Sequence, residues 1–351
     1  MAQQQKEAPS CLILAGALNI KSLPKPGSKD FSAAVSRDLS LLSTLNKEFR
    51  ELAESRDAAQ VAEQVSASLP SVLELVFTRR YGWSEFKSHP GLRDFFRTSK
   101  PKLDGEADAL LKLLSESLPA NVFLDLFLQQ AQRQKDASIR RQIFKANILY
   151  IKSLVRSKTQ SAQAQFGSSI LNVILAGLTD VWSSIRKDTA RSLFVKGESF
   201  LDPDGVKSIY TALVNIVSRS DSDSKWQSVD GALHGIHAIV VDELRQQADL
   251  QGTTTGYSPP HYLWETIQHD VCIPMFGHSQ GDIRSNAGKI FLSFLGFRRA
   301  QEERTGILDS LLAQLKPRAD NMLLPDFTVR PVTRFLAHTC MISIVLSIAT
   351  G

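Results

Sequence analysis

The chain of 351 residues has few cysteines and lacks a common mark of secreted proteins. Its three cysteines, Cys11, Cys272 and Cys340, are odd in number and far apart, which excludes a disulfide framework. No Asn-x-Ser/Thr glycosylation site occurs in the sequence either. We therefore expect a protein of a reducing compartment, the cytoplasm, with the nucleus as an alternative.

Short motifs for cofactors and metals are also missing. The sequence contains no Walker loop, no G-x-G-x-x-G, no C-x-x-C and no H-E-x-x-H. His234 and His237 are three residues apart, and His269, Cys272 and His278 follow within the same part of the sequence. Imidazoles on an amphipathic helix are usually packed or solvated, so we predict no metal site and no cofactor.

Long hydrophobic runs are absent as well. The apolar stretch 11–20 has no signal cleavage site after it. Near the C-terminus, Arg334 and His338 interrupt the apolar segment 331–350 and leave the run 339–349, shorter than the ~18 to 20 residues of a spanning helix. We expect no membrane contact. The segment 331–350 reads as one helix of a further pair, whose apolar edge a partner, a second copy or further sequence would cover.

Charge is the first feature that is present in excess, and it is local. The content of 43% hydrophobic and 22% charged residues is typical of a soluble globular protein, and the net charge is +5. Eight Lys and Arg residues and one acid, Asp136, lie between Arg133 and Lys158. That segment carries a charge of +7 and leaves −2 for the remainder, so the basic excess belongs to one segment.

A motif recurs four times along the chain. A pair of residues opens a helix, and small or apolar residues follow four and seven positions after the first residue of the pair. In three of the copies the pair is an aliphatic residue followed by Arg. The copies begin 46, 40 and 58 residues apart, close to the period of helix-pair repeats. The opening pairs are Ile139-Arg140, Ile185-Arg186, Lys225-Trp226 and Ile283-Arg284, and the residues that follow them are Ile143 and Ala146, Thr189 and Ser192, Val229 and Ala232, and Ala287 and Ile290.

The physical reason for this motif is packing. At 100° per residue, the apolar positions that follow Ile139 fall within a stripe about 100° wide, so that side of the helix must be buried. Small residues at the seventh position let a partner helix approach closely. One pair cannot cover its own apolar face, and each pair therefore needs neighbours. The sequence predicts an all-α protein, built as a right-handed α-solenoid of helix pairs.

The second and fourth copies resemble HEAT repeats. The stretch 171–193 has an aliphatic first helix, a turn aspartate at Asp180, the Ile185-Arg186 pair and a small-residue second helix. The resemblance covers about 119–297. It implies that aspartates and arginines form a ladder between adjacent repeats, and it implies a non-catalytic scaffold that binds other proteins. The residues it assigns to the ladder are Arg140, Asp180, Arg186 and Arg284.

Composition and periodicity divide the chain into four parts. We predict a disordered segment over 1–30, an irregular helical region over 31–118, HEAT-like repeats over 119–300, and further helices with an incomplete terminal repeat over 301–351. The irregular region should contain helices at 31–55, 58–79 and 105–117. The first helices of the repeats should lie at 121–132, 167–178, 203–217 and 262–275, the third of them opened by Asp202-Pro203 as a capped start.

The basic segment places its charges on one side of a helix. Phe144 and Ile148 flank them and favour a protein partner with an acidic segment, whereas RNA phosphates are the alternative ligand. No aromatic residues interleave with the cations as base stacking would need. A purely solvated helix face is the other interpretation. The four cations, which we call the basic ridge, lie within about 60° of one another: Arg141, Lys145, Lys152 and Arg156.

One pattern suggests an enzyme. Residues 277–281 match the G-x-S-x-G turn of serine hydrolases, with Ser279 as nucleophile. However, Pro274 interrupts the strand that must precede such a turn, and no strand and helix alternation or HGGG segment is present. The same residues fit a turn between two helices, so we predict a structural Ser279 and no catalytic residues. The triad partners in chain order would be Asp309 or Asp326, then His338.

Overall fold

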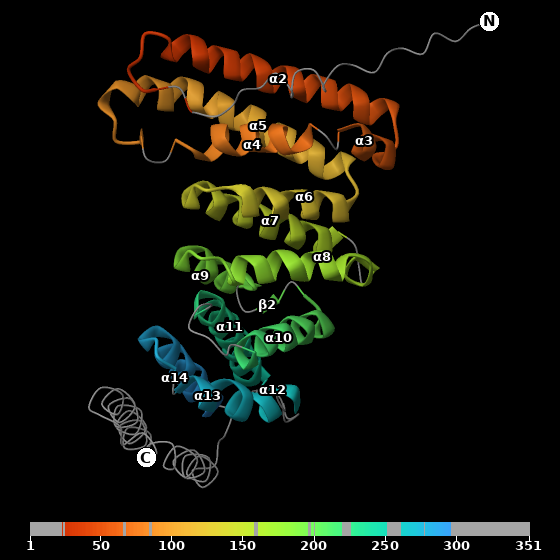
Figure 1. Ribbon diagram of the computed structural model, residues 1–351. Coiled ribbons are helices and arrows are strands. Elements are labelled where there is room, and N and C mark those ends of the chain that lie inside the picture. Colours follow the sequence, from red (N-terminus) through yellow and green to blue (C-terminus); the bar gives the residue numbers. More distant parts are fainter. Residues whose placement is uncertain are drawn as a thin grey trace, which may run out of the picture. The chain divides into compact units, whose positions relative to one another are not determined.

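Helices make up almost all of the part of the chain that the structure describes (Figure 1). The exception there is an antiparallel pair of two-residue strands, β1 (Phe194–Val195) and β2 (Glu198–Ser199). The prediction of an all-α protein is confirmed. The computed structural model describes residues 23, 25–65, 68–83, 86–157, 161–195, 198–199, 201–219, 226–250, 261–276 and 278–295.

Several sequence predictions lie outside the described residues. They are the apolar segment 331–350, the triad candidates Asp309, Asp326 and His338, and most of the segment 1–30. Of that last segment, residues 25–30 form turns in which the N–H of Ser28 donates to the carbonyl of Lys25 at 3.2 Å.

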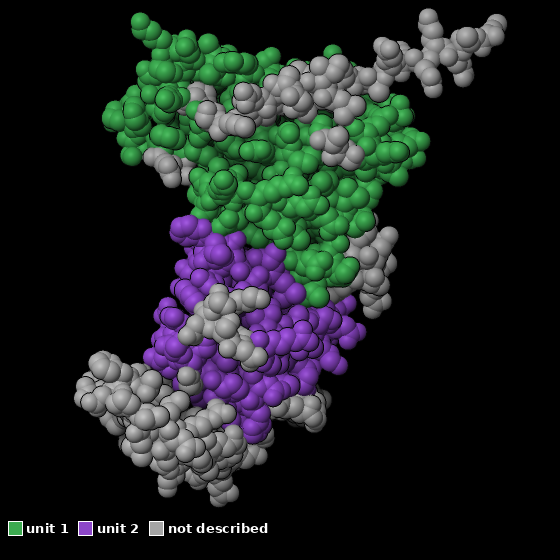
Figure 2. Space-filling model, in the orientation of Figure 1, with its two compact units in different colours: residues 1–174 green, residues 175–351 purple. Residues whose placement is uncertain are grey.

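The chain forms two compact units, residues 1–174 and 175–351 (Figure 2). The boundary lies inside one helix, α8 (Ser161–Leu178), and inside the range 119–300 for which the sequence predicts one array. The units are described separately.

In unit 1, α2 packs along α5, and α4 contacts α5, α6 and α7. The helices α6 and α7 also pack on each other. The elements are α2 (Phe31–Ser55), α3 (Ala58–Val65), α4 (Leu69–Tyr81), the short turns η2 (Pro90–Leu92) and η3 (Phe95–Ser99), α5 (Lys100–Ser117), α6 (Ala120–Arg133), α7 (Ala137–Ser157) and the greater part of α8.

Local sequence accounts for most of these boundaries. The predicted helix 31–55 is confirmed as α2, which buries Leu42, Leu45 and Phe49 at helical spacing. The predicted helical segment 58–79 contains two helices, because a new helix, α4, begins just before Pro70. Proline has no N–H to donate and its ring excludes the preceding turn of a helix, so it is tolerated only in a first turn.

In unit 2, α11 is the central helix. It packs against α9, α10 and α14, while α10 and α14 also contact the π-helical turn η5. One row of helices is therefore α9, α11 and α14, and a second row is α10 and η5. The elements are α9 (Ser183–Ser192), α10 (Pro203–Ser218), α11 (Trp226–Leu250), α12 (His261–Thr266), η5 (Ile267–Cys272), α13 (Ile273–Phe276) and α14 (Gly281–Leu295).

The start of α10 confirms its predicted cap. Asp202 Oδ1 accepts from the N–H of Gly205 at 2.7 Å, and Pro203 is the first helical residue. The single helix predicted over 262–275 is instead divided into α12, η5 and α13. Pro274 cannot donate to the carbonyl four residues before it, and the backbone shifts to π-helical bonding just upstream.

Candidate functional site

The basic ridge lies on α7. Lys145 and Arg156 are exposed, whereas Arg141 and Lys152 are half-buried. Burial lowers the pKa of the Lys152 ammonium, and the neighbouring Arg156 charge lowers it further. The four cations share one face of α7 by helical spacing.

The expected apolar flanks of the ridge are wrong. Phe144 and Ile148 are 4% and 3% exposed, because α7 packs against α6 and α4 and its buried arc is wider than the stripe inferred from the motif. A different residue supplies an apolar surface. Leu149 is 67% exposed and lies one helical turn after Lys145, on the ridge side of α7. An exposed leucine among cations has no role in the core of unit 1.

Three turns between helices share one hydrogen-bond pattern, and we call them the arginine turns. In each, the residue six positions before an arginine accepts twice. Its backbone carbonyl accepts from arginine Nη1 at 2.7, 2.8 and 2.6 Å in chain order. Its side chain accepts from the backbone N–H two residues later at 3.1, 2.8 and 3.1 Å. The turns are Gln134–Arg140, Asp180–Arg186 and His278–Arg284.

The second and third arginine turns contain one further bond. Arg186 Nη1 also donates to the carbonyl of Val181 at 2.9 Å, and Arg284 Nη1 donates to that of Ser279 at 2.7 Å. These bonds satisfy carbonyls that follow the end of the preceding helix. The arginines therefore hold each turn closed, and the carboxylate of Asp180 caps the N–H of Trp182.

Arg186 also carries a buried ion pair. The guanidinium, in a residue only 1% exposed, donates from Nε and Nη2 to Asp230 Oδ2 at 3.0 and 2.7 Å. It also lies over the ring of Trp226, with 5.7 Å between the guanidinium carbon and the ring centroid. Arg186 is on α9 and Asp230 is on α11, so the pair joins two helices through residues that are 44 positions apart in sequence.

The buried carboxylate continues the connection to a third helix. Asn286 Nδ2, on α14, donates to Asp230 Oδ1 at 2.8 Å, and the Asp230 and Asn286 residues are 3% and 7% exposed. We name Arg186, Asp230 and Asn286 the buried ladder. His234 Nε2 lies 3.7 Å from Asp230 Oδ1. Burial lowers the pKa of His234 despite the attraction of Asp230, which favours a neutral imidazole beside the ladder at pH 7.

The sequence motif did not identify the acid of the buried ladder. Asp230 stands directly after the apolar motif residue Val229 and two positions before Ala232. An acid inside an otherwise buried stripe of a helix was the available signal, because such a charge needs a buried partner.

A glycine permits the close approach of α11 to the end of α8. A Cβ placed on Gly231 would lie 1.5 Å from the carbonyl oxygen of Leu178 and 2.7 Å from Arg186 Cδ. No side chain larger than hydrogen fits at that point. The glycine next to Asp230 therefore brings the helix backbone within reach of the arginine turn.

Ser279 lies in the third arginine turn. The element before it is a helix, α13, and the strand that a serine nucleophile turn needs is absent from this position. Its carbonyl accepts from Arg284, and the N–H of the next residue donates to His278 Nδ1. The matched motif coincides with a repeat of the turn seen at Arg140 and Arg186.

Two of the residues considered as metal ligands contact other groups. His237 Nε2 lies 3.4 Å from Ser293 Oγ, and Cys272 is a fully buried free thiol whose Sγ is 3.6 Å from the carbonyl of Ala287. Burial raises the pKa of that thiol. Within the described ranges, no three His, Cys, Asp or Glu side chains gather as a metal site would need.

Among the described helices, none combines the length and the apolar content that crossing a membrane requires. A scan against protein-family models found no match, and a search of curated proteins found none either.

Proposed function

We propose that this protein is a non-catalytic scaffold that binds other proteins, built as a right-handed α-solenoid of HEAT-like helix pairs. The observation that supports it best is the recurrence of one hydrogen-bond pattern in three turns, at Arg140, Arg186 and Arg284. A turn that recurs with the same donor and acceptors is typical of a structural repeat. The two rows of helices in unit 2 also fit stacked pairs.

The partner surface that we propose is the ridge side of α7. Lys145 and Arg156 supply exposed positive charge, and Leu149 supplies an apolar contact between them. Charge steers an oppositely charged partner, and desolvated apolar contact supplies much of the binding energy. The partner should therefore carry an acidic segment with an apolar side chain. RNA would use the cations but gain little from the leucine, so a protein is the better fit.

The proposal places the protein in the cytoplasm. The buried free thiol of Cys272 is compatible with a reducing compartment, where unpaired cysteines persist.

Affinity capture from an extract of the expressing cells, with the whole chain as bait, tests the surface. The ridge variant Lys145→Glu with Arg156→Glu should lose its partner, and so should the wild type between about 50 and 200 mM salt. A matched control reverses two exposed cations elsewhere in unit 1, Arg93→Glu with Lys102→Glu, and should keep the partner.

Two further arms separate the ligand classes. Leu149→Ser should weaken capture of a protein partner and leave capture of RNA unchanged, whereas ribonuclease should abolish capture only if RNA is the ligand. Equal recovery of all partners with the ridge variant and with the matched control would refute the proposed surface.

A further inference from the structure

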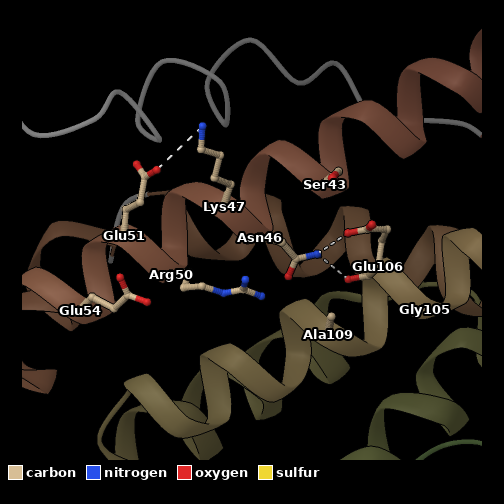
Figure 3. Close-up of a pocket in the computed structure, with 9 residues that line it drawn as sticks. All are labelled: Ser43, Asn46, Lys47, Arg50, Glu51, Glu54, Gly105, Glu106 and Ala109. Atoms are coloured by element: carbon tan, nitrogen blue, oxygen red, sulfur yellow. Dashed lines mark hydrogen bonds and ion pairs between the residues drawn. The ribbon is translucent and has the colours of Figure 1, made fainter.

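A groove in unit 1 is distinct from the basic ridge. A cavity of about 570 Å³ lies between α2 and α5, within the size range of ligand sites in proteins. The α2 wall contributes residues at helical spacing from Ser43 to Glu54, and the α5 wall contributes Gly105, Glu106 and Ala109 (Figure 3).

Asn46 lines the groove and carries an unsatisfied acceptor. Its residue is 6% exposed, and its Nδ2 donates to the backbone carbonyl and to Oε2 of Glu106 at 2.9 and 2.8 Å. These two bonds fix which way the amide points. Its Oδ1 is buried and accepts no hydrogen bond. In Figure 3 this oxygen points away from Glu106, toward the side of the groove where Arg50 lies. A buried acceptor without a donor is costly, and a ligand N–H would remove that cost.

Arg50 supplies the complementary donors. Its guanidinium extends along the groove below Asn46 in Figure 3. It makes no ion pair with the residues that the structure describes, although acids line the same groove; Glu51 instead lies 3.9 Å from Lys47. A planar guanidinium with five N–H groups binds a carbonyl or carboxylate well.

Gly105 keeps the groove open. A Cβ placed there would meet no atom within 4 Å, so the space beside it is empty. A glycine inside a helix such as α5 costs stability relative to other residues, and here no close helix contact requires it. The residue one turn later, Ala109, is also small.

We propose that this groove binds an extended peptide segment of neutral or basic character. Asn46 Oδ1 can accept a hydrogen bond from a peptide N–H, and the Arg50 guanidinium can donate to a peptide carbonyl. Together they match the main chain of a peptide, whose N–H and carbonyl groups are free only when it is extended. The wall from Ser43 to Glu54 is about 16 Å long, room for roughly five extended residues. Two cations and three carboxylates line the groove, so an acidic peptide is disfavoured.

The test selects ligands on the whole immobilised chain from a phage-displayed library of random linear peptides. An enriched peptide is then synthesised with a fluorophore and titrated by anisotropy. Arg50→Gln should weaken binding by about tenfold or more, the loss of one charge-assisted hydrogen bond. Gly105→Leu should abolish binding by filling the groove while raising the thermal midpoint, because it removes a helical glycine.

Lys112→Gln, on the same helix but outside the groove, and the ridge variant should bind the peptide as the wild type does. Failure to enrich any peptide, or equal binding by Gly105→Leu, would overturn the proposal. A wild-type chain that self-associates in sedimentation, with Gly105→Leu monomeric, would also overturn it by assigning the groove to a second copy.

Discussion

The turns at Arg186 and Arg284 show two different uses of one motif. Both arginines donate Nη1 to carbonyls six and five residues before them, at 2.6 to 2.9 Å. Arg186 is buried and also pairs with Asp230, whereas Arg284 is half-buried and its hydrogen bonds go to carbonyls of its own turn. The motif therefore closes a turn by itself, but a connection between helices depends on an acid placed by another helix.

The largest expected effect comes from removing the cation of the buried ladder. Arg186→Ala leaves the Asp230 carboxylate buried without its cation, although Asn286 still donates to it, and breaking a buried pair in this way costs about 3 to 5 kcal/mol. Hydrogen exchange over residues 226–250 and urea unfolding should both report the loss. The exposed Arg191→Ala is the matched control, because Arg191 is 78% exposed and lies 3.8 Å from Asp188. If Arg186→Ala loses no more unfolding free energy than Arg191→Ala, the buried ladder does not contribute to stability.

The second-largest effect should come from the close backbone contact between α11 and the end of α8. Gly231→Ala forces the end of α8 away from α11, since the added Cβ would lie 1.5 Å from the Leu178 carbonyl oxygen. Overpacking of this kind costs about 1 to 3 kcal/mol and should also lengthen the Arg186 to Asp230 bonds. Gly105→Ala is the control in an open position and should stabilise the protein by up to about 1 kcal/mol. Equal unfolding midpoints for the two alanine variants in urea would contradict the close approach.

Removing Arg284 should lower the free energy of unfolding by less than removing Arg186. Arg284→Ala loses two hydrogen bonds to backbone carbonyls that water can partly replace, so we expect about 1 kcal/mol. Faster hydrogen exchange should be confined to residues 278–286. If faster exchange spreads to α9, this turn also supports the buried ladder, and the proposed difference between Arg284 and Arg186 is wrong.

The sequence predicts the parts of this structure that local chemistry decides. Apolar spacing located α2, and a carboxylate before a proline located the start of α10 at Asp202. The motif also picked out Arg186, because a cation follows an aliphatic residue at each of three turns. These features depend on residues within one or two helical turns.

What could not be predicted depends on neighbours that are distant in sequence. Asp230 and Asn286 meet Arg186 from other helices, and nothing in one helix states which buried acid will lie opposite. Phe144 and Ile148 were expected beside the basic ridge because only one packed side of α7 was inferred, whereas the helix is covered over a wider arc. The groove at Asn46 arises only when α2 and α5 pack, so no motif marks it.

The smallest effect is a pH dependence of unit 2. Burial lowers the pKa of His234, and burial with the nearby Lys289 lowers that of His237. Because the folded pKa lies below the ordinary value of about 6.5, the unfolded chain binds protons more readily, and stability present above that pH is lost as the pH falls. Urea unfolding between pH 7.5 and 5 should show a loss of about 1 kcal/mol or less that His234→Gln with His237→Gln removes. The exposed His89→Gln, in unit 1, should leave the slope unchanged. A double variant that keeps the wild-type slope would move the pH dependence to other groups, and the neutral imidazole beside the buried ladder would have no part in it.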